Sequence, residues 1–207
     1  MNLGAYRAEV RSLLGLRGDE GQAADADLNR AINAALSATA TVSNWPWLFV
    51  EEGATLAAGL NYILPPPYWT ATEYLAAPHG ELVLASRREL RQVGSYTSGK
   101  PWYWAPAGNR IYIGPTSPSD LTLTHGFYRT EPDLVSNTDA PFLPPAYDNW
   151  LVVEAAMRVA LRLNNRDRAD LLRQEGIEWR GRIMDNVRKT TSLPPIRRTR
   201  PSIWQDR

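Results

Sequence analysis

The sequence contains no cysteine and only two histidines among its 207 residues. Without cysteine, the chain forms no disulfide and offers no thiolate ligand to a metal ion. A zinc or copper site would need carboxylates to complete a ligand set begun by the two histidines, and no HExxH-like spacing is present. We therefore expect neither a metal nor a cofactor.

Long apolar runs are also missing. No stretch approaches the roughly 18 apolar residues that a membrane-spanning helix needs. Residues 1–14 include the acidic Glu9 and no extended hydrophobic segment, so we do not expect a signal peptide. The sequence therefore predicts a protein that does not contact membranes.

Catalytic motifs are absent as well. No Gly-rich loop leads from a strand into a helix with phosphate-binding spacing, and there is no Gly-x-Ser-x-Gly nucleophile elbow. His79 lies between Pro78 and Gly80, which is typical of an exposed turn. His125 lies in a predicted strand, where we expect it to pack or to contact a partner. We expect the protein not to be an enzyme.

Helical periodicity appears at both ends of the chain. Apolar residues recur on one face in 3–14 and again from 25 to 43, where Asp25 is the expected N-cap. Two further helices are predicted over 146–163 and 166–188. The first of these is apolar nearly all round, which indicates a central position.

The middle of the chain shows short apolar or aromatic runs separated by Pro and Gly, which favours strands. Ser86 and Glu89 have capping-box spacing, so one short helical turn is expected over 87–92. Leu121, Leu123 and His125 alternate with threonines, as in a half-buried strand. The expected strands are 47–52, 60–64, 72–77, 81–85, 101–105, 109–113 and 121–129.

These elements predict an α+β fold. The N- and C-terminal helix pairs, in 1–45 and 144–188, are expected to form a four-helix bundle body because their apolar stripes must meet. Residues 46–143 form a β-rich insertion, and 189–207 form an extended C-terminal tail.

The sequence contains eight tryptophans, and two of them flank Tyr103 in the β-rich region. Trp102 and Trp104 could form a stacking platform for glycans or single-stranded nucleic acid. Alternatively, they fill a small β core while the other strand face meets a neighbour. A nucleic-acid platform would carry interleaved basic residues, and only Lys100 and Arg110 are close. We therefore favour the second interpretation, with Trp102, Trp104 and Tyr112 as a β-region interface.

Charge is unevenly distributed. Residues 188–207 hold six basic residues and one acidic residue, a formal charge of +5, so the remaining residues carry −4. This basic segment could bind nucleic acid, remain a solvated end, or lie in a groove on a partner. We favour the last, because a solvated end gains nothing from apolar residues near its terminus, and these are typical interface anchors. The expected docking residues are Arg188, Lys189, Arg197, Arg198, Arg200, Ile203 and Trp204.

Several segments in this order resemble one protein family. After the opening helix and its Gly-rich turn come 25–33, 61–65, 86–90, 99–101, 109–115, 127–129 and 139–144. The chain thereby resembles the head-to-tail adaptors of tailed bacteriophages, also called connector or tail tubular A-like proteins. The loop at 64–67 departs from the family by carrying Pro where an acidic residue is usual.

The resemblance implies a structural protein of the virion, located at the head-tail junction after assembly in the host cytoplasm. It implies a cyclic ring, expected to be a dodecamer, that docks on the portal protein through a C-terminal arm. The ring would meet a tail or nozzle protein and leave a channel through which DNA passes without sequence readout. The alternative function is an aromatic-platform binding module for glycans or single-stranded nucleic acid.

Overall fold

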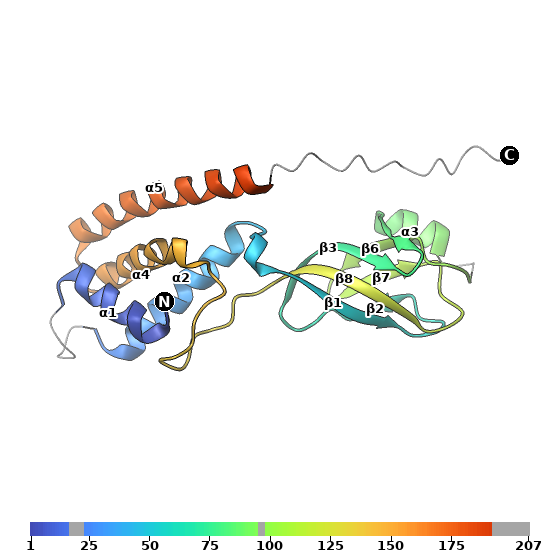
Figure 1. The fold of residues 1–207 in the computed structure, drawn as a ribbon, viewed down its shortest axis with the longest axis horizontal. Helices are drawn as coiled ribbons and strands as arrows, with labels where there is room; N and C mark the ends of the chain where they lie inside the picture. The colour runs from blue at the N-terminus through green and yellow to red at the C-terminus, as the bar shows by residue number, and fades with distance from the viewer. Residues whose placement is uncertain (17–22, 95–97, 192–207) are drawn as a thin grey trace.

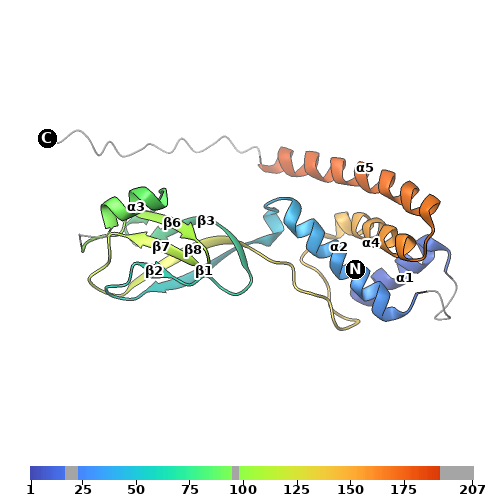
Figure 2. The ribbon, with the colours of Figure 1, turned by 180° about the vertical axis from the view of Figure 1, so that it is seen from behind.

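A computed structural model describes residues 1–16, 23–94 and 98–191 (Figure 1). The molecule is elongated, with most of the helices at one end and the strands, with one short helix, at the other. The view from behind shows the same division (Figure 2). Within the described ranges, no helix combines the length and apolar character needed to cross a membrane.

The helical end contains α1 (Leu3–Leu14), α2 (Asp25–Val42), α4 (Asp148–Arg162) and α5 (Arg166–Thr191). Asn2 caps α1, because its side-chain oxygen accepts a hydrogen bond of 2.9 Å from the backbone N–H of Ala5. The helix ends at Gly15, whose φ of 68° suits a residue without Cβ.

The expected N-cap of α2 is wrong by one residue. Ala24 occupies the cap position, and Asp25 is the first residue of the helix. The Asp25 carboxylate instead accepts hydrogen bonds from the guanidinium groups of Arg7 and Arg11. These ion pairs tie the start of α2 to α1.

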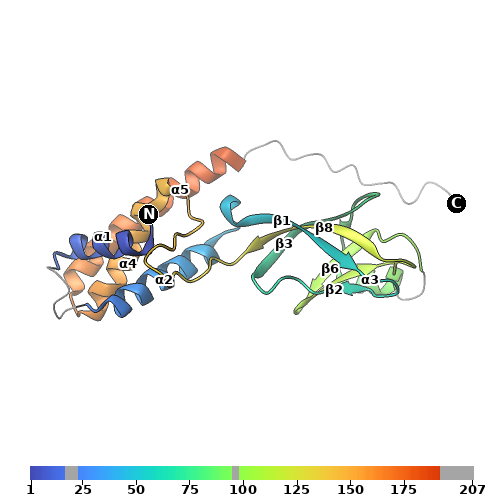
Figure 3. The ribbon, with the colours of Figure 1, turned by 60° about the horizontal axis from the view of Figure 1, so that its bottom comes forward.

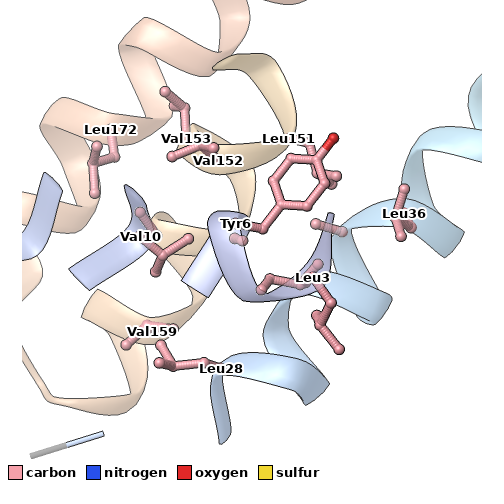
Figure 4. Close-up of a cluster of buried hydrophobic side chains, with 14 of the residues drawn as sticks. Leu3, Tyr6, Val10, Leu28, Leu36, Leu151, Val152, Val153, Val159 and Leu172 are labelled. Atoms are coloured by element: carbon pink, nitrogen blue, oxygen red, sulfur yellow. The ribbon is translucent and has the colours of Figure 1, made fainter. Parts of the chain in front are cut away.

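The helical core lies between α1, α2, α4 and α5 (Figure 4). Leu3, Tyr6 and Val10 share one face of α1, as their spacing predicts, and all three are fully buried. Tyr6 donates a hydrogen bond to the buried carboxylate of Asp148. Because burial and this bond to Asp148 both disfavour a phenolate, the pKa of Tyr6 is strongly raised.

The expected four-helix bundle body is wrong. The described residues contain five α-helices and two four-stranded sheets, and the helical end is organised around one helix. α4 packs against α1, α2 and α5, whereas α5 packs chiefly on α4. The reason is that α4 is apolar nearly all round, so its neighbours surround it instead of sharing one bundle interior. The α+β class itself agrees with the structure.

The strand end, here called the β unit, consists of two four-stranded sheets. Their strand orders are β1-β8-β3-β4 and β2-β7-β6-β5. Residues from both sheets, including Leu56, Leu123, Trp104 and Ile111, form one buried cluster, so the sheets pack face to face. The strands are β1 (Phe49–Leu56), β2 (Tyr62–Ile63), β3 (Trp69–Ala77), β4 (Gly80–Glu81), β5 (Val83–Leu84), β6 (Tyr103–Ala107), β7 (Arg110–Gly114) and β8 (Leu121–Arg129).

A short helix, α3 (Arg87–Gly94), packs on β6 and β7. The capping box is confirmed, since the Ser86 N–H donates to Glu89 Oε2 at 2.8 Å and the Glu89 N–H donates to Ser86 Oγ at 3.2 Å. Leu90 is buried beneath the helix and fixes its position on the sheet.

The chain enters the β unit through β1 and leaves it through β8, and these strands are antiparallel neighbours from Phe49↔Tyr128 to Leu56↔Leu121. Figure 3 shows them side by side in the β unit, starting where it meets the helical end. Before β1, Pro46–Leu48 form a short 3₁₀ helix, η1. After β8, the chain returns along α1 and α2, with Leu134 and Leu143 buried in the helical core, to η2 (Pro145–Tyr147) and α4.

Candidate assembly surfaces

The basic C-terminal segment follows α5, which is long and exposed on most of its surface. Ala169, Leu172 and Ile183 are buried, whereas Leu171 and Ile177 are 59% and 66% exposed. Arg188 and Lys189 belong to the last turns of α5, but their side chains lie outside the described residues. The other expected docking residues, Arg197, Arg198, Arg200, Ile203 and Trp204, also lie outside them.

The last part of α5 packs on an aromatic cluster, here called the junction cluster, which is built on Trp45, Leu48, Trp150 and Ile183. Trp45 stacks on Trp47 with ring centroids 4.7 Å apart. The Trp45 ring also meets the Trp150 ring edge-to-face, with ring centroids 6.0 Å apart. The indole N–H of Trp45 donates a 2.7 Å hydrogen bond to the carbonyl of Thr39 at the end of α2.

The junction cluster also touches the β unit, because half-buried Tyr128 of β8 packs against it. The cluster therefore holds α2, η1, α4, α5 and β8 together where the two ends of the molecule meet. Figures 1 and 2 show the end of α5 above this point.

The structure separates the three residues expected at the β-region interface. Trp104 is 3% exposed and belongs to the core between the sheets, whereas Trp102 is 45% exposed. The Trp102 and His79 rings meet edge-to-face with their centroids 4.9 Å apart. His79 Nε2 donates a hydrogen bond of 2.7 Å to the Pro101 carbonyl. His79 is thus half-buried and hydrogen-bonded, not a free turn residue. A stacking platform made by both tryptophans is not present in this arrangement.

Tyr112 lies on the outer face of the second sheet, next to Tyr62, with ring centroids 6.1 Å apart. The Arg110 guanidinium lies 4.3 Å above the centre of the Tyr62 ring, and that of Arg87 lies 5.7 Å from the centre of Tyr112. These cation–π contacts create a basic, aromatic surface beside α3.

The first sheet has a different outer face. Glu51 of β1, Gly126 of β8 and Tyr74 of β3 form one row across the sheet. The Tyr74 hydroxyl donates to Glu51 Oε1 at 2.6 Å, above Gly126. The hydrogen bond to Glu51, with burial and nearby acidic charge, raises the pKa of Tyr74 to about 12. Sequence reasoning missed this row, whose one visible signal is a glycine inside a strand.

A groove of about 450 Å³ lies beside β1 and the 62–66 segment and includes Glu52 and His125 in its wall. His125 is 1% exposed, and burial lowers its pKa to about 4, so the ring is neutral at neutral pH. His125 Nε2 and Thr72 Oγ1 are hydrogen-bonded at 2.9 Å. Tyr68 donates to both Glu52 carboxylate oxygens, at 2.7 and 2.9 Å.

These hydrogen bonds hold the Glu52 carboxylate and the His125 ring in the wall of the groove. In the ranges that the structure covers, no group of three or more His, Asp or Glu side chains is arranged to hold a metal ion. The geometry instead provides surfaces: the exposed helix α5, and two outer sheet faces of different charge.

Comparison with known families agrees with a role in assembly. The model of the family described as SU10 adaptor protein matches residues 1–198. That range includes the helical end, the β unit and the basic segment as far as Arg198. A search of curated proteins found no match.

Proposed function

Because the chain belongs to the SU10 adaptor protein family, we propose that this phage adaptor protein is a subunit of a cyclic ring that joins the portal to the tail. The observation that carries the proposal is the family match, which spans both ends of the molecule. We expect a dodecamer, as the sequence resemblance implies. Portal protein, a tail or nozzle protein and further copies of the chain are the proposed partners.

Residues 189–207 are the proposed portal-docking arm, and Arg188 just before it is included among the docking residues. Residues 188–207 together carry a charge of +5, in contrast with −4 on the rest of the chain. The junction cluster supports this role, because it fixes the end of α5 and so gives the arm a defined starting point. Residues 192–207, when extended, reach roughly 50–60 Å, which is far enough to lie along a partner subunit.

The ring would leave a channel for DNA. A channel for DNA passage works best when its wall binds the phosphate backbone weakly, because neutralising phosphates with basic residues gives tight, salt-dependent binding. A body with a charge of −4 is compatible with such passage and with no sequence readout.

Removal of the part of the arm that follows α5 tests the proposal, and Arg188 and Lys189 remain in the truncated protein. The truncation should follow Thr191, because α5 extends to that residue and Val187 packs on the junction cluster. We expect the protein lacking 192–207 to keep its thermal unfolding midpoint and to lose binding to purified portal particles at least tenfold. Unchanged portal binding after the truncation would contradict the docking arm.

A pair of point variants tests the apolar anchors within the arm. Trp204→Ala is expected to weaken portal binding, because buried aromatic anchors carry a large share of interface energy. Ser202→Ala, two residues away, is the matched control and should bind like the parent protein. Cosedimentation with portal particles measures both, and equal binding by the two variants would contradict an anchoring role for Trp204.

A further inference from the structure

The β unit has two outer faces that point in opposite directions. Its sheets enclose one common core, formed by residues such as Leu75 and Ile113, so each sheet turns its second face outward. The sheet β1-β8-β3-β4 has one outer face, here called the acidic face. The sheet β2-β7-β6-β5 with α3 has the other, here called the basic face (Figures 1 and 2).

The acidic face carries Glu51, Glu73 and Glu81 on three different strands. Glu51 lies in the row of Tyr74, and Glu81 lies one row further, opposite Ala76. Glu73 is exposed near Tyr128, whose pKa is raised by burial and by the Glu73 charge. The only Arg or Lys in the strands of this sheet is Arg129, whose guanidinium lies 3.4 Å over the Phe142 ring.

The basic face has the opposite sign. The strands β2, β5, β6 and β7 contain no Asp or Glu, and their one charged residue is Arg110. α3 adds Arg87, Arg88 and Arg91, whereas its single acid, Glu89, accepts the capping hydrogen bond from Ser86. Arg87, Arg88 and Arg110 are exposed.

We propose that the acidic face of one copy docks on the basic face of the next copy, so that the β units form a continuous belt in the assembled ring. The occupant of each face is thus a second copy of this chain. Two different, complementary patches on opposite sides of a subunit are what a head-to-tail contact requires, and such contacts close into a ring when the rotation between copies allows it. This inference rests on the proposed ring and adds the surfaces that form it.

Charge complementarity selects a second copy over other occupants. Charged faces of opposite sign steer association and reject wrong orientations, because like charges in contact are unfavourable. Tyr62 and Tyr112 add flat aromatic area beside the arginines, which is typical of interface centres. A contact of the acidic face with itself, or of the basic face with itself, would place like charges together.

The absence of cysteine allows a direct crosslinking test. The full-length double variant Glu73→Cys with Arg110→Cys places one thiol on each face. Under mild oxidation, at high protein concentration and on portal particles, we expect a ladder of disulfide-linked multimers. The matched control, Glu73→Cys with Arg173→Cys, moves the second thiol to exposed α5 and should give at least tenfold less product.

Each outcome of the crosslinking decides the proposal. A ladder from the first pair alone supports it. Equal ladders from both pairs, or no ladder in either sample, overturn it, and so does efficient dimer formation by Glu73→Cys alone, which indicates a symmetric contact. Portal binding is scored on the same samples. Lost crosslinking with intact portal binding refutes the face pairing, whereas crosslinking without portal binding supports it and contradicts the docking arm.

Charge reversal gives an independent test that a folding defect cannot imitate. The double variant Glu73→Lys with Glu81→Lys leaves Glu51 as the only acid of the three and so makes both faces basic. The double variant Arg87→Glu with Arg110→Glu makes both faces acidic. We expect each variant alone to associate at least tenfold more weakly and the equimolar mixture to recover association, as measured by analytical ultracentrifugation. Failure of the mixture to recover overturns the proposal.

The same acidic variant separates a second copy from nucleic acid as the occupant of the basic face. We expect Arg87→Glu with Arg110→Glu to leave any affinity for a fluorescent DNA duplex unchanged while weakening self-association. Loss of duplex binding with full self-association would assign the basic face to DNA and overturn the proposal.

Discussion

The ring of Tyr74 lies directly over Gly126, and a Cβ atom at position 126 would come within 2.3 Å of the ring carbon Cε1. Glu51 holds the Tyr74 hydroxyl at 2.6 Å on the far side of the glycine. The acidic face of the β unit therefore depends on a strand position without a side chain.

Gly126→Ala is expected to destabilise the protein by about 1–3 kcal/mol, because the added methyl group forces Tyr74 out of its position. Gly53→Ala, on neighbouring β1, is the control, since a Cβ there meets nothing within 4 Å. Urea unfolding followed by tryptophan fluorescence measures both. Similar losses for the two variants would show that the Tyr74 contact does not cause the effect.

The two buried tryptophans of the junction cluster should respond differently to replacement by phenylalanine. Trp45→Phe leaves the Thr39 carbonyl without its 2.7 Å hydrogen bond, whereas the Trp150 indole N–H has no partner among the described residues. Both variants lose ring volume, but only Trp45→Phe removes a hydrogen bond from a buried carbonyl. Loss of that hydrogen bond costs about 1–3 kcal/mol more. We expect Trp45→Phe to lower the free energy of unfolding more, and the reverse order in chemical denaturation would contradict this account.

His125 should make stability depend on pH. Its folded-state pKa of about 4 lies below the ordinary value of 6.5, so the unfolded chain binds the proton first as pH falls. The contribution of neutral His125 to the free energy of unfolding is therefore fully present above pH 6.5. It is lost as pH falls from 6.5 towards 4, by roughly 3 kcal/mol in total.

The variant His125→Gln isolates this effect, because it removes the titrating group and keeps a polar side chain beside Thr72. We expect its free energy of unfolding to change less between pH 6.5 and 5, a range in which most carboxylates stay ionised. The measurement is denaturant unfolding at several pH values. Parallel curves for the variant and the parent protein would rule out His125 as the source.

Local sequence patterns predicted much of the fold. The stripe Leu3, Tyr6 and Val10 and the alternation ending at His125 are buried as expected, because helix and strand periods determine which residues share a face. The Ser86–Glu89 capping box is equally local and is confirmed.

Features that depend on distant residues were not predictable in the same way. The Tyr74–Gly126 contact depends on the pairing of β3 with β8, which a bulge between Thr72 and Tyr74 shifts. Asp25 was a reasonable N-cap by sequence, but two arginines from α1 compete for its carboxylate. The four-helix bundle failed because the apolar surface of α4 was expected in a shared interior and is covered from several sides instead.

For the candidate surfaces, the sequence indicated residue types but not their placement. Trp102 and Trp104 are two residues apart and would share a side of a regular strand. β6 begins only at Tyr103, so Trp102 lies before the strand and remains exposed while Trp104 is buried. The expected portal-docking residues stay a prediction, because most of them lie beyond residue 191.

The pairing of Phe49 with Tyr128 places the entry and exit of the β unit next to each other. Paired residues of antiparallel strands have Cα atoms only about 5 Å apart. A tight turn could span such a gap. The stretch of more than seventy residues between Phe49 and Tyr128 therefore begins and ends at almost the same point beside the helical end. A change in the length of the β unit away from this pair therefore leaves the packing around α4 unchanged, as long as Tyr128 keeps its contact with the junction cluster.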